Sequence, residues 1–141
     1  MLELLLPCLY SFLACIGFCI IYNIRGKLII YASFGGALGW FVFLLLAPYQ
    51  HELLQYMVAM MSITLYSEIM ARYKKVPATL FLITGLIPLV PGGGIYYTME
   101  HFLNGDTTQF LSSFIHTISI AGSLALSILI MSSLIQLYIR R

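Results

Sequence analysis

The chain has 141 residues, of which 61% are hydrophobic and only 9% are charged, and its mean hydropathy is +0.97. Soluble domains carry about 25% charged residues, so this chain has too little polar surface to cover a water-facing globule. The formal net charge of +2, with no basic stripe, argues against a nucleic-acid-binding protein. The composition predicts an all-α membrane protein, with the bilayer as its solvent.

The hydropathy pattern predicts five transmembrane helices, because each spanning helix needs about 20 mostly apolar residues. The expected spans are residues 4–24, 28–47, 53–71, 77–97 and 110–139, which together make one transmembrane domain over residues 1–141. The N-terminal segment lacks the positively charged start of a signal peptide, so we expect it to be a retained helix. Three cysteines lie in it without a CxxC pair, which favours buried apolar thiols over metal or disulfide chemistry; no cofactor or metal is expected.

The basic residues predict how the chain is oriented. They lie outside the spans and in alternate connections, namely Arg25 and Lys27, then Arg72, Lys74 and Lys75, then Arg140 and Arg141. The positive-inside rule places all of them on the cytoplasmic side, with the N-terminus outside and the C-terminus inside. This arrangement needs an odd number of helices, which five spans satisfy. We therefore expect a multi-pass protein of the cell membrane.

Rows of small residues recur at helical spacing in three of the spans. Gly35 and Gly39 form a GxxxG pair in the second span, and small or polar side chains line one face of the first and fifth spans: Ser11, Cys15 and Cys19, and Ser119, Ser123 and Ser127 beside Gly122. Such rows let two helix backbones approach closely in lipid. Close helix packing is the favoured interpretation, and a substrate-lining role is the alternative.

The fourth span contains two prolines and three glycines within seven residues, from Pro88 to Gly94. Each proline lacks the amide that would bond to the carbonyl four residues earlier, so Pro88 releases the carbonyl of Thr84 and Pro91 releases that of Ile87. The pattern predicts that the helix ends here and that a short helix begins near Gly94 or Ile95. At about 1.5 Å per residue, Pro88 lies roughly 16 Å beyond the start of the span, close to the middle of the bilayer.

Irregular backbone at this depth survives only where protein or a water-filled cavity covers it, and transporters use such breaks to bind substrates. Released carbonyls can hold a cation, and the amides that begin the next helix can hold a carboxylate. The predicted substrate-binding residues are Thr84, Ile87, Pro88, Pro91, Gly92, Gly93 and Gly94. The alternatives are a simple kink, or a helix that ends early near the outer surface.

Glu68 is the one charged residue that lies well inside a predicted span. Carboxylates within membranes are costly and usually functional, so Glu68 is a candidate proton carrier or gating residue. Arg72 follows four residues later, at the spacing of an ion pair within a helix. A structural Glu68–Arg72 pair is therefore the alternative. His116, in the fifth span, is a weaker candidate and is expected to be a packed polar residue.

Three stretches of the chain resemble the membrane domain of the threonine/serine exporter family. They are Ser67-Glu68-Ile69-Met70-Ala71-Arg72, then Lys75-Val76-Pro77-Ala78, then Ile87-Pro88-Leu89-Val90-Pro91-Gly92-Gly93 with Tyr96. Tyr96 joins the candidate site on this ground alone. The chain resembles most closely the short, membrane-only subunit of the split form of the family, although its third consecutive glycine departs from the motif.

The resemblance implies proton-driven export of threonine and serine, or of a dicarboxylate such as succinate. It also implies a larger partner subunit, with a cytosolic domain and about five more helices; a homo-oligomer is the alternative assembly. A structural or assembly subunit without its own transport path is a competing function. The sequence contains no GxSxG or HExxH motif, so we do not expect an enzyme.

Overall fold

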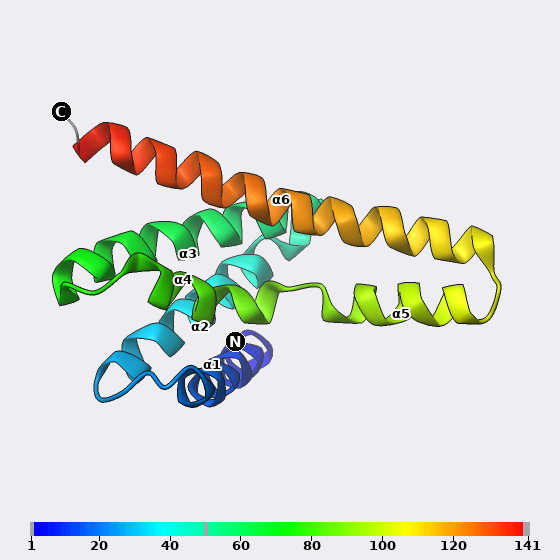
Figure 1. Cartoon of the computed structure of the whole chain (residues 1–141). Coiled ribbons are helices and arrows are strands. Elements are labelled where there is room, and N and C mark those ends of the chain that lie inside the picture. The colour runs from blue at the N-terminus through cyan, green and yellow to red at the C-terminus, as the bar shows by residue number, and fades with distance from the viewer. Residues whose placement is uncertain (1, 50, 140–141) are drawn as a thin grey trace.

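The computed structural model describes residues 2–49 and 51–139, which form helices and no strands, so the all-α prediction is confirmed for this part of the chain (Figure 1). The elements in chain order are α1 (Leu2–Ile21), α2 (Leu28–Leu45), η1 (Ala47–Tyr49), α3 (Glu52–Lys74), α4 (Ala78–Leu86), η2 (Ile87–Leu89), α5 (Gly92–Leu103) and α6 (Thr107–Ile139). The predicted spans correspond to α1, α2, α3, the segment from α4 to α5, and α6.

Local chemistry explains where several helices end and begin. Lys75 closes α3 in the left-handed conformation (φ 56°), and the amide of Val76 donates to the carbonyl of Ala71 at 3.1 Å. This pair of features terminates a helix by satisfying its last carbonyls. At the start of α6, the amide of Gln109 donates to Oδ1 of Asp106 at 3.1 Å, which is the usual role of an aspartate N-cap.

Three helices are long and apolar enough to cross a membrane: α2, α3 and α6. The segment Ala78–Leu89 and helix α5 meet the same criteria together, with a bend of 52° between them, and would make a fourth span. The described apolar part of α1, Leu5–Ile21, is shorter. The structure therefore supports three or four spans among the described residues, and the fifth span remains a prediction.

Helix α2 lies at the centre of the bundle, where it packs against α1, α3 and α4, while α6 packs against α3. Its glycines provide the close approach that the sequence predicted. A β-carbon on Gly35 would lie 3.1 Å from the ring of Tyr66 in α3, and one on Gly36 would collide with Sγ of Cys15 in α1. Ser123 and Ser127 of α6 are also buried. In contrast, a β-carbon on Gly122 would meet nothing within 4 Å, so this glycine makes no close packing contact among the described residues.

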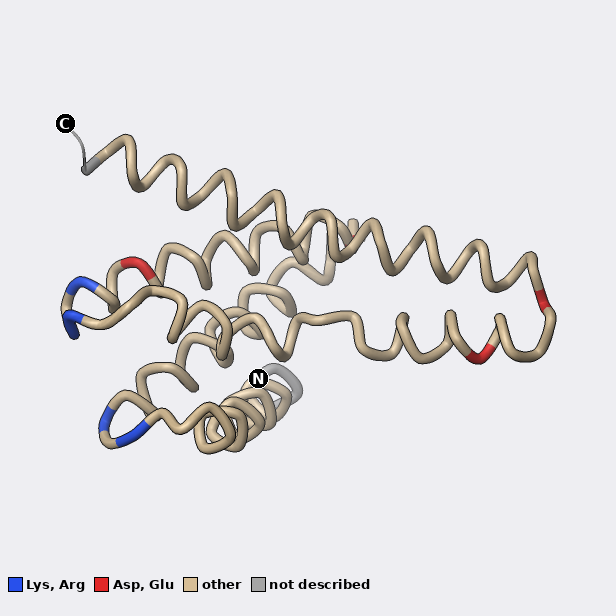
Figure 2. Tube along the Cα trace, in the orientation of Figure 1, with Lys and Arg blue, Asp and Glu red and all other residues tan. Residues whose placement is uncertain are grey.

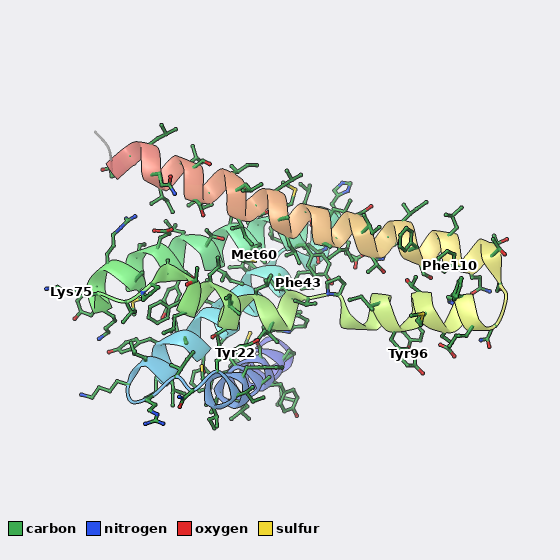
Figure 3. All side chains as sticks on the ribbon, in the orientation of Figure 1. Tyr22, Phe43, Met60, Lys75, Tyr96 and Phe110 are labelled. Carbon is green, nitrogen blue, oxygen red and sulfur yellow. The ribbon has the colours of Figure 1, made fainter. Side chains whose placement is uncertain are left out.

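Helices α5 and α6 form an antiparallel hairpin that extends past the rest of the bundle (Figure 1). The rings of Phe102 and Phe110 pack with centroids 5.4 Å apart near its tip, where Figure 3 labels Phe110. The prediction of an outer loop from residue 98 to residue 109 is wrong, because α5 continues to Leu103. Its apolar residues pack on α6, while polar neighbours such as Glu100 stay exposed, so the helix gains contacts without burying charge.

Charges separate along the long direction of the bundle. Figure 2 shows the lysines and arginines of the α1–α2 and α3–α4 connections at one end, and acidic residues of the α5–α6 hairpin at the other. We call the first the basic end and the second the hairpin end. The two basic connections share one end, as the predicted orientation requires. Arg140 and Arg141 lie outside the described residues, and which end faces the cytoplasm remains a prediction.

We expect Gly36→Ala to lower the thermal stability of the detergent-solubilised protein. The added methyl group collides with Cys15 and lies 3.5 Å from Cγ of Pro88, and overpacking of this kind costs about 1–3 kcal/mol. Gly122→Ala is the matched control, because nothing lies near that position and alanine favours a helix by about 1 kcal/mol over glycine. Thermal unfolding followed by size-exclusion chromatography measures both variants. Equal stability of the two would contradict the close α1–α2 contact.

Candidate functional site

The fourth predicted span is broken, as the proline and glycine pattern indicated. Helix α4 ends at Leu86, a single 3₁₀ turn follows, Val90 is extended (φ −63°, ψ 129°), and α5 begins at Gly92. The prediction that the second piece starts near Gly94 or Ile95 placed its beginning two or three residues too late. Proline cannot supply a helical amide but has a backbone angle suited to a helix start, so α5 begins directly after Pro91.

The carbonyls that the prolines release already have partners. The carbonyl of Thr84 accepts a hydrogen bond from the thiol of Cys15 at 3.4 Å, in a buried contact between α4 and α1. The carbonyl of Ile87 accepts from the amide of Val90 at 3.2 Å, within the turn. The prolines release both carbonyls from the helical bond, but each has found another donor, and their role as substrate ligands stays a prediction. A neighbouring helix satisfies the first and the 3₁₀ turn satisfies the second, as the absence of water in hydrocarbon demands.

Unlike these carbonyls, most of the amides at the start of α5 have no backbone hydrogen-bond partner. The amide of Gly92 donates to the carbonyl of Val90 at 2.7 Å, whereas those of Gly93 and Gly94 have no backbone acceptor within the described chain. A β-carbon on Gly93 would meet nothing within 4 Å, but one on Gly94 would lie 2.5 Å from Oγ1 of Thr117. Gly94 thus lets α5 pack against α6, and Gly93 leaves the helix start open.

The contacts of the break give its depth in the bundle. Pro88 lies against Gly36, which is at the middle of α2, so the break occurs at mid-bundle, and its depth in the bilayer stays a prediction. Gly94 lies farther along, beside Thr117 of α6. The glycines are therefore displaced from the middle towards the hairpin end.

A polar contact between α6 and α3 gives the height of the start of α5 independently. Nε2 of His116 in α6 lies 2.9 Å from Oε2 of Glu52, the first residue of α3. His116 is next to Thr117, so the start of α5 is level with the start of α3. The sequence suggested a packed polar histidine, but the side chain of His116 is 55% exposed. The pair was missed because its members are 64 residues apart in the chain.

Glu68 and Arg72 form the ion pair that their spacing allowed. Nη2 of Arg72 lies 3.0 Å from Oε2 of Glu68, and the glutamate side chain is 23% exposed. The pair lies near the basic end of α3, which ends at Lys74, and away from the glycines of the break. The structural pair is therefore present, and a proton-carrying role for Glu68 stays a prediction.

The predicted site residues do not share one cavity. Thr84 lines a cavity of about 290 Å³ between α1 and α4, with Tyr22, Ile24, Pro77, Thr79, Leu80 and Ile83. Pro88 lines a different cavity of about 310 Å³, with Pro7, Tyr10, Ser11, Ala14 and Trp40. Tyr96 is 65% exposed and borders a shallow pocket on α5 with Met99, Glu100, Leu103 and Asn104 (Figure 3). Among the described residues, no three His, Cys, Asp or Glu side chains are grouped to hold a metal ion.

A family model described as "Threonine/Serine exporter, ThrE" matches residues 7–134, from α1 through the break and most of α6. The chain belongs to this family. Membership in the threonine/serine exporter family makes it a membrane protein of amino-acid export, within a transporter family rather than an enzyme family. No curated protein and no solved structure matches the chain.

For this exporter-family chain, we expect Glu68→Gln to preserve export and to lower thermal stability only slightly. A partly exposed pair four residues apart contributes about 0–1 kcal/mol, and Glu68 lies apart from the break. Glu52→Gln, which removes the partner of His116, is the control for loss of a carboxylate at the opposite end of α3. Efflux of labelled threonine and thermal unfolding measure both. Loss of export by a folded Glu68→Gln protein would instead identify Glu68 as a proton carrier.

Proposed function

We propose that the chain is a subunit of a secondary exporter in the cell membrane, which moves small carboxylate-bearing solutes out of the cell by using the proton gradient. Threonine and serine are the first substrates to consider, and a dicarboxylate such as succinate is the second. Family membership supports the class of activity. The observation that carries the proposal is the helix broken at mid-bundle, a feature that transporters use to bind solutes within the membrane.

The start of α5 is the part of the break best suited to a carboxylate. Its first amides, at Gly93 and Gly94, have no backbone acceptor in the described chain, and the N-terminus of a helix carries partial positive charge. Gly92 and Gly93 also leave open space where other residues would place a side chain. The carbonyls of Thr84 and Ile87 are less suitable ligands, since each already accepts a hydrogen bond.

We propose further that a second chain covers the α5–α6 hairpin. None of the residues in α5 is buried, and large apolar side chains such as Phe102 and Leu103 are 61% and 78% exposed. Alternating access commonly uses two related bundles, and the described residues form one. The partner is a larger subunit with a cytosolic domain and about five more helices, or a second copy of the chain. The same exposed face supports the alternative function, an assembly subunit without its own transport path.

We expect efflux of labelled threonine from cells that express the chain with its partner to stop when the proton gradient is dissipated. A proton-coupled exporter loses its driving force under that condition, whereas a passive channel continues to equilibrate the solute. The measurement is repeated with labelled serine and succinate, and with the partner alone. Full efflux from the partner alone would establish the assembly role instead.

We expect Gly93→Leu to abolish this efflux without preventing assembly. The leucine side chain meets no neighbour in the structure but covers the amides that begin α5. Gly122→Leu is the matched control, because that glycine also has open space beside it but lies on α6, away from the break. Unchanged efflux in a Gly93→Leu protein that assembles normally would remove these amides from the substrate site.

A further inference from the structure

Helix α1 meets the broken segment at one buried point. Figure 1 views α1 nearly along its axis while α4 runs across the picture, so the two helices cross steeply. At the crossing, the thiol of Cys15 donates to the carbonyl of Thr84 at 3.4 Å. Gly36 of α2 lies directly behind Cys15, and Pro88 lies against the same glycine. Residues of α1, α2 and the α4–η2 segment therefore pack tightly against one another at this point.

Two of the cavities next to α1 border the broken segment, and they lie on opposite sides of this crossing. The first, which we call the loop-side cavity, lies between the residues after α1 and the first half of α4, where Figure 3 labels Tyr22. The second, the break-side cavity, lies between the first half of α1, Trp40 of α2 and Pro88. Along α1, Cys15 follows the residues of the break-side cavity and precedes those of the loop-side cavity. Along α4 and η2, Thr84 separates Ile83 from Pro88 in the same way.

The size of each cavity suits a small solute. Their volumes are about 290 and 310 Å³, at the lower end of the range of roughly 300–1,000 Å³ found for small-molecule sites. Their linings are mainly apolar with a few hydroxyl groups, those of Tyr22, Thr79 and Thr84 in one and those of Tyr10 and Ser11 in the other. This combination of apolar walls and a few polar groups is typical of ligand sites.

Ser11 gives the break-side cavity a polar group that needs a partner. The residue is 6% exposed, and its hydroxyl is buried without a hydrogen-bond partner in the described part of the chain. Leaving a buried hydroxyl unpaired costs about 1–3 kcal/mol. Because the hydroxyl itself is fully buried, a solute can bond to it only when the contact between α1 and η2 opens.

The contact that separates the cavities is suited to opening. Proline at position 88 removes the amide that would otherwise hold the Thr84 carbonyl within the helix. A thiol is a weak hydrogen-bond donor, so its bond to Thr84 is more easily broken than the backbone bond it replaces. Helix α1 packs mainly on α2 and only slightly on α4 and η2. Separation of α1 from α4 therefore disrupts little of the packing that holds α1 in place.

We propose that the solute path runs along the seam between α1 and the α4–η2 segment, with the loop-side and break-side cavities as its two halves and the Cys15–Thr84 contact as the closed constriction between them. This inference rests on the proposed function of solute export. It places the path along a face of α1, beside the broken span. It also explains why Thr84 and Pro88 border different cavities although one turn of chain separates them.

Cysteine accessibility tests the path. Ser11→Cys reports on the break-side cavity and Ile83→Cys on the loop-side cavity, each in a chain whose native cysteines are replaced by Cys8→Ser, Cys15→Ser and Cys19→Ser. Serine at position 15 keeps a donor for the carbonyl of Thr84. Leu126→Cys is the matched control, since Leu126 is 55% exposed on α6 and lines neither cavity. A charged, membrane-impermeant methanethiosulfonate reagent is added to either side of vesicles that contain the chain with its partner. Ala14→Cys replaces Ser11→Cys if the buried position does not tolerate the change.

We expect the reagent to modify the two cavity positions from opposite sides of the membrane, with loss of labelled-threonine efflux and with protection by unlabelled threonine. The control position, which faces lipid, is expected to stay unmodified because a charged reagent does not enter hydrocarbon. Efflux by the unmodified variants with no modification at either cavity position would overturn the path and leave the export function intact. Absence of efflux from the wild-type chain with its partner would contradict the proposed function itself.

Discussion

Water is absent from the hydrocarbon core, so every backbone group that a proline releases there needs a protein partner. In this chain the requirement falls on the carbonyl of Thr84, four residues before Pro88. The thiol of Cys15 meets it from a different helix, and Cys15 can reach Thr84 only because Gly36 has no side chain in its place. A local defect in one helix thereby determines how three helices pack.

The need to satisfy backbone groups without water divides the break into two parts, one packed and one open. Where the chain lies at mid-bundle, neighbouring atoms occupy its released carbonyls, and the result is close packing around Gly36 and Ile63. Where the chain reaches the level of Glu52, the first amides of α5 are left without backbone acceptors and the glycines open the helix start. A tightly packed crossing and a helix start whose amides have no backbone acceptor therefore lie within one short segment.

The α5–α6 hairpin is the part of the bundle that the proposed partner chain would cover. Helix α6 has 33 residues, or about 50 Å at 1.5 Å per residue, which exceeds a hydrocarbon core of about 30 Å. Its first turns and α5 extend past the start of α3 and expose aromatic and aliphatic side chains. Exposure to lipid accounts for the apolar face near the bundle, and a partner chain would cover the part that extends beyond it.

The sequence by itself determined the features that depend on neighbouring residues: the helical class, the break at Pro88 to Gly94, the i,i+4 geometry of Glu68 and Arg72, and the family. Tertiary structure decided what depends on distant residues. It paired Cys15 with Thr84 and His116 with Glu52, and it placed Thr84 and Pro88 in separate cavities. The physical reason is that proline and glycine act on their own backbone, whereas the partner of a released carbonyl is chosen by how whole helices cross. The pattern of residues along one helix does not predict where another helix crosses it.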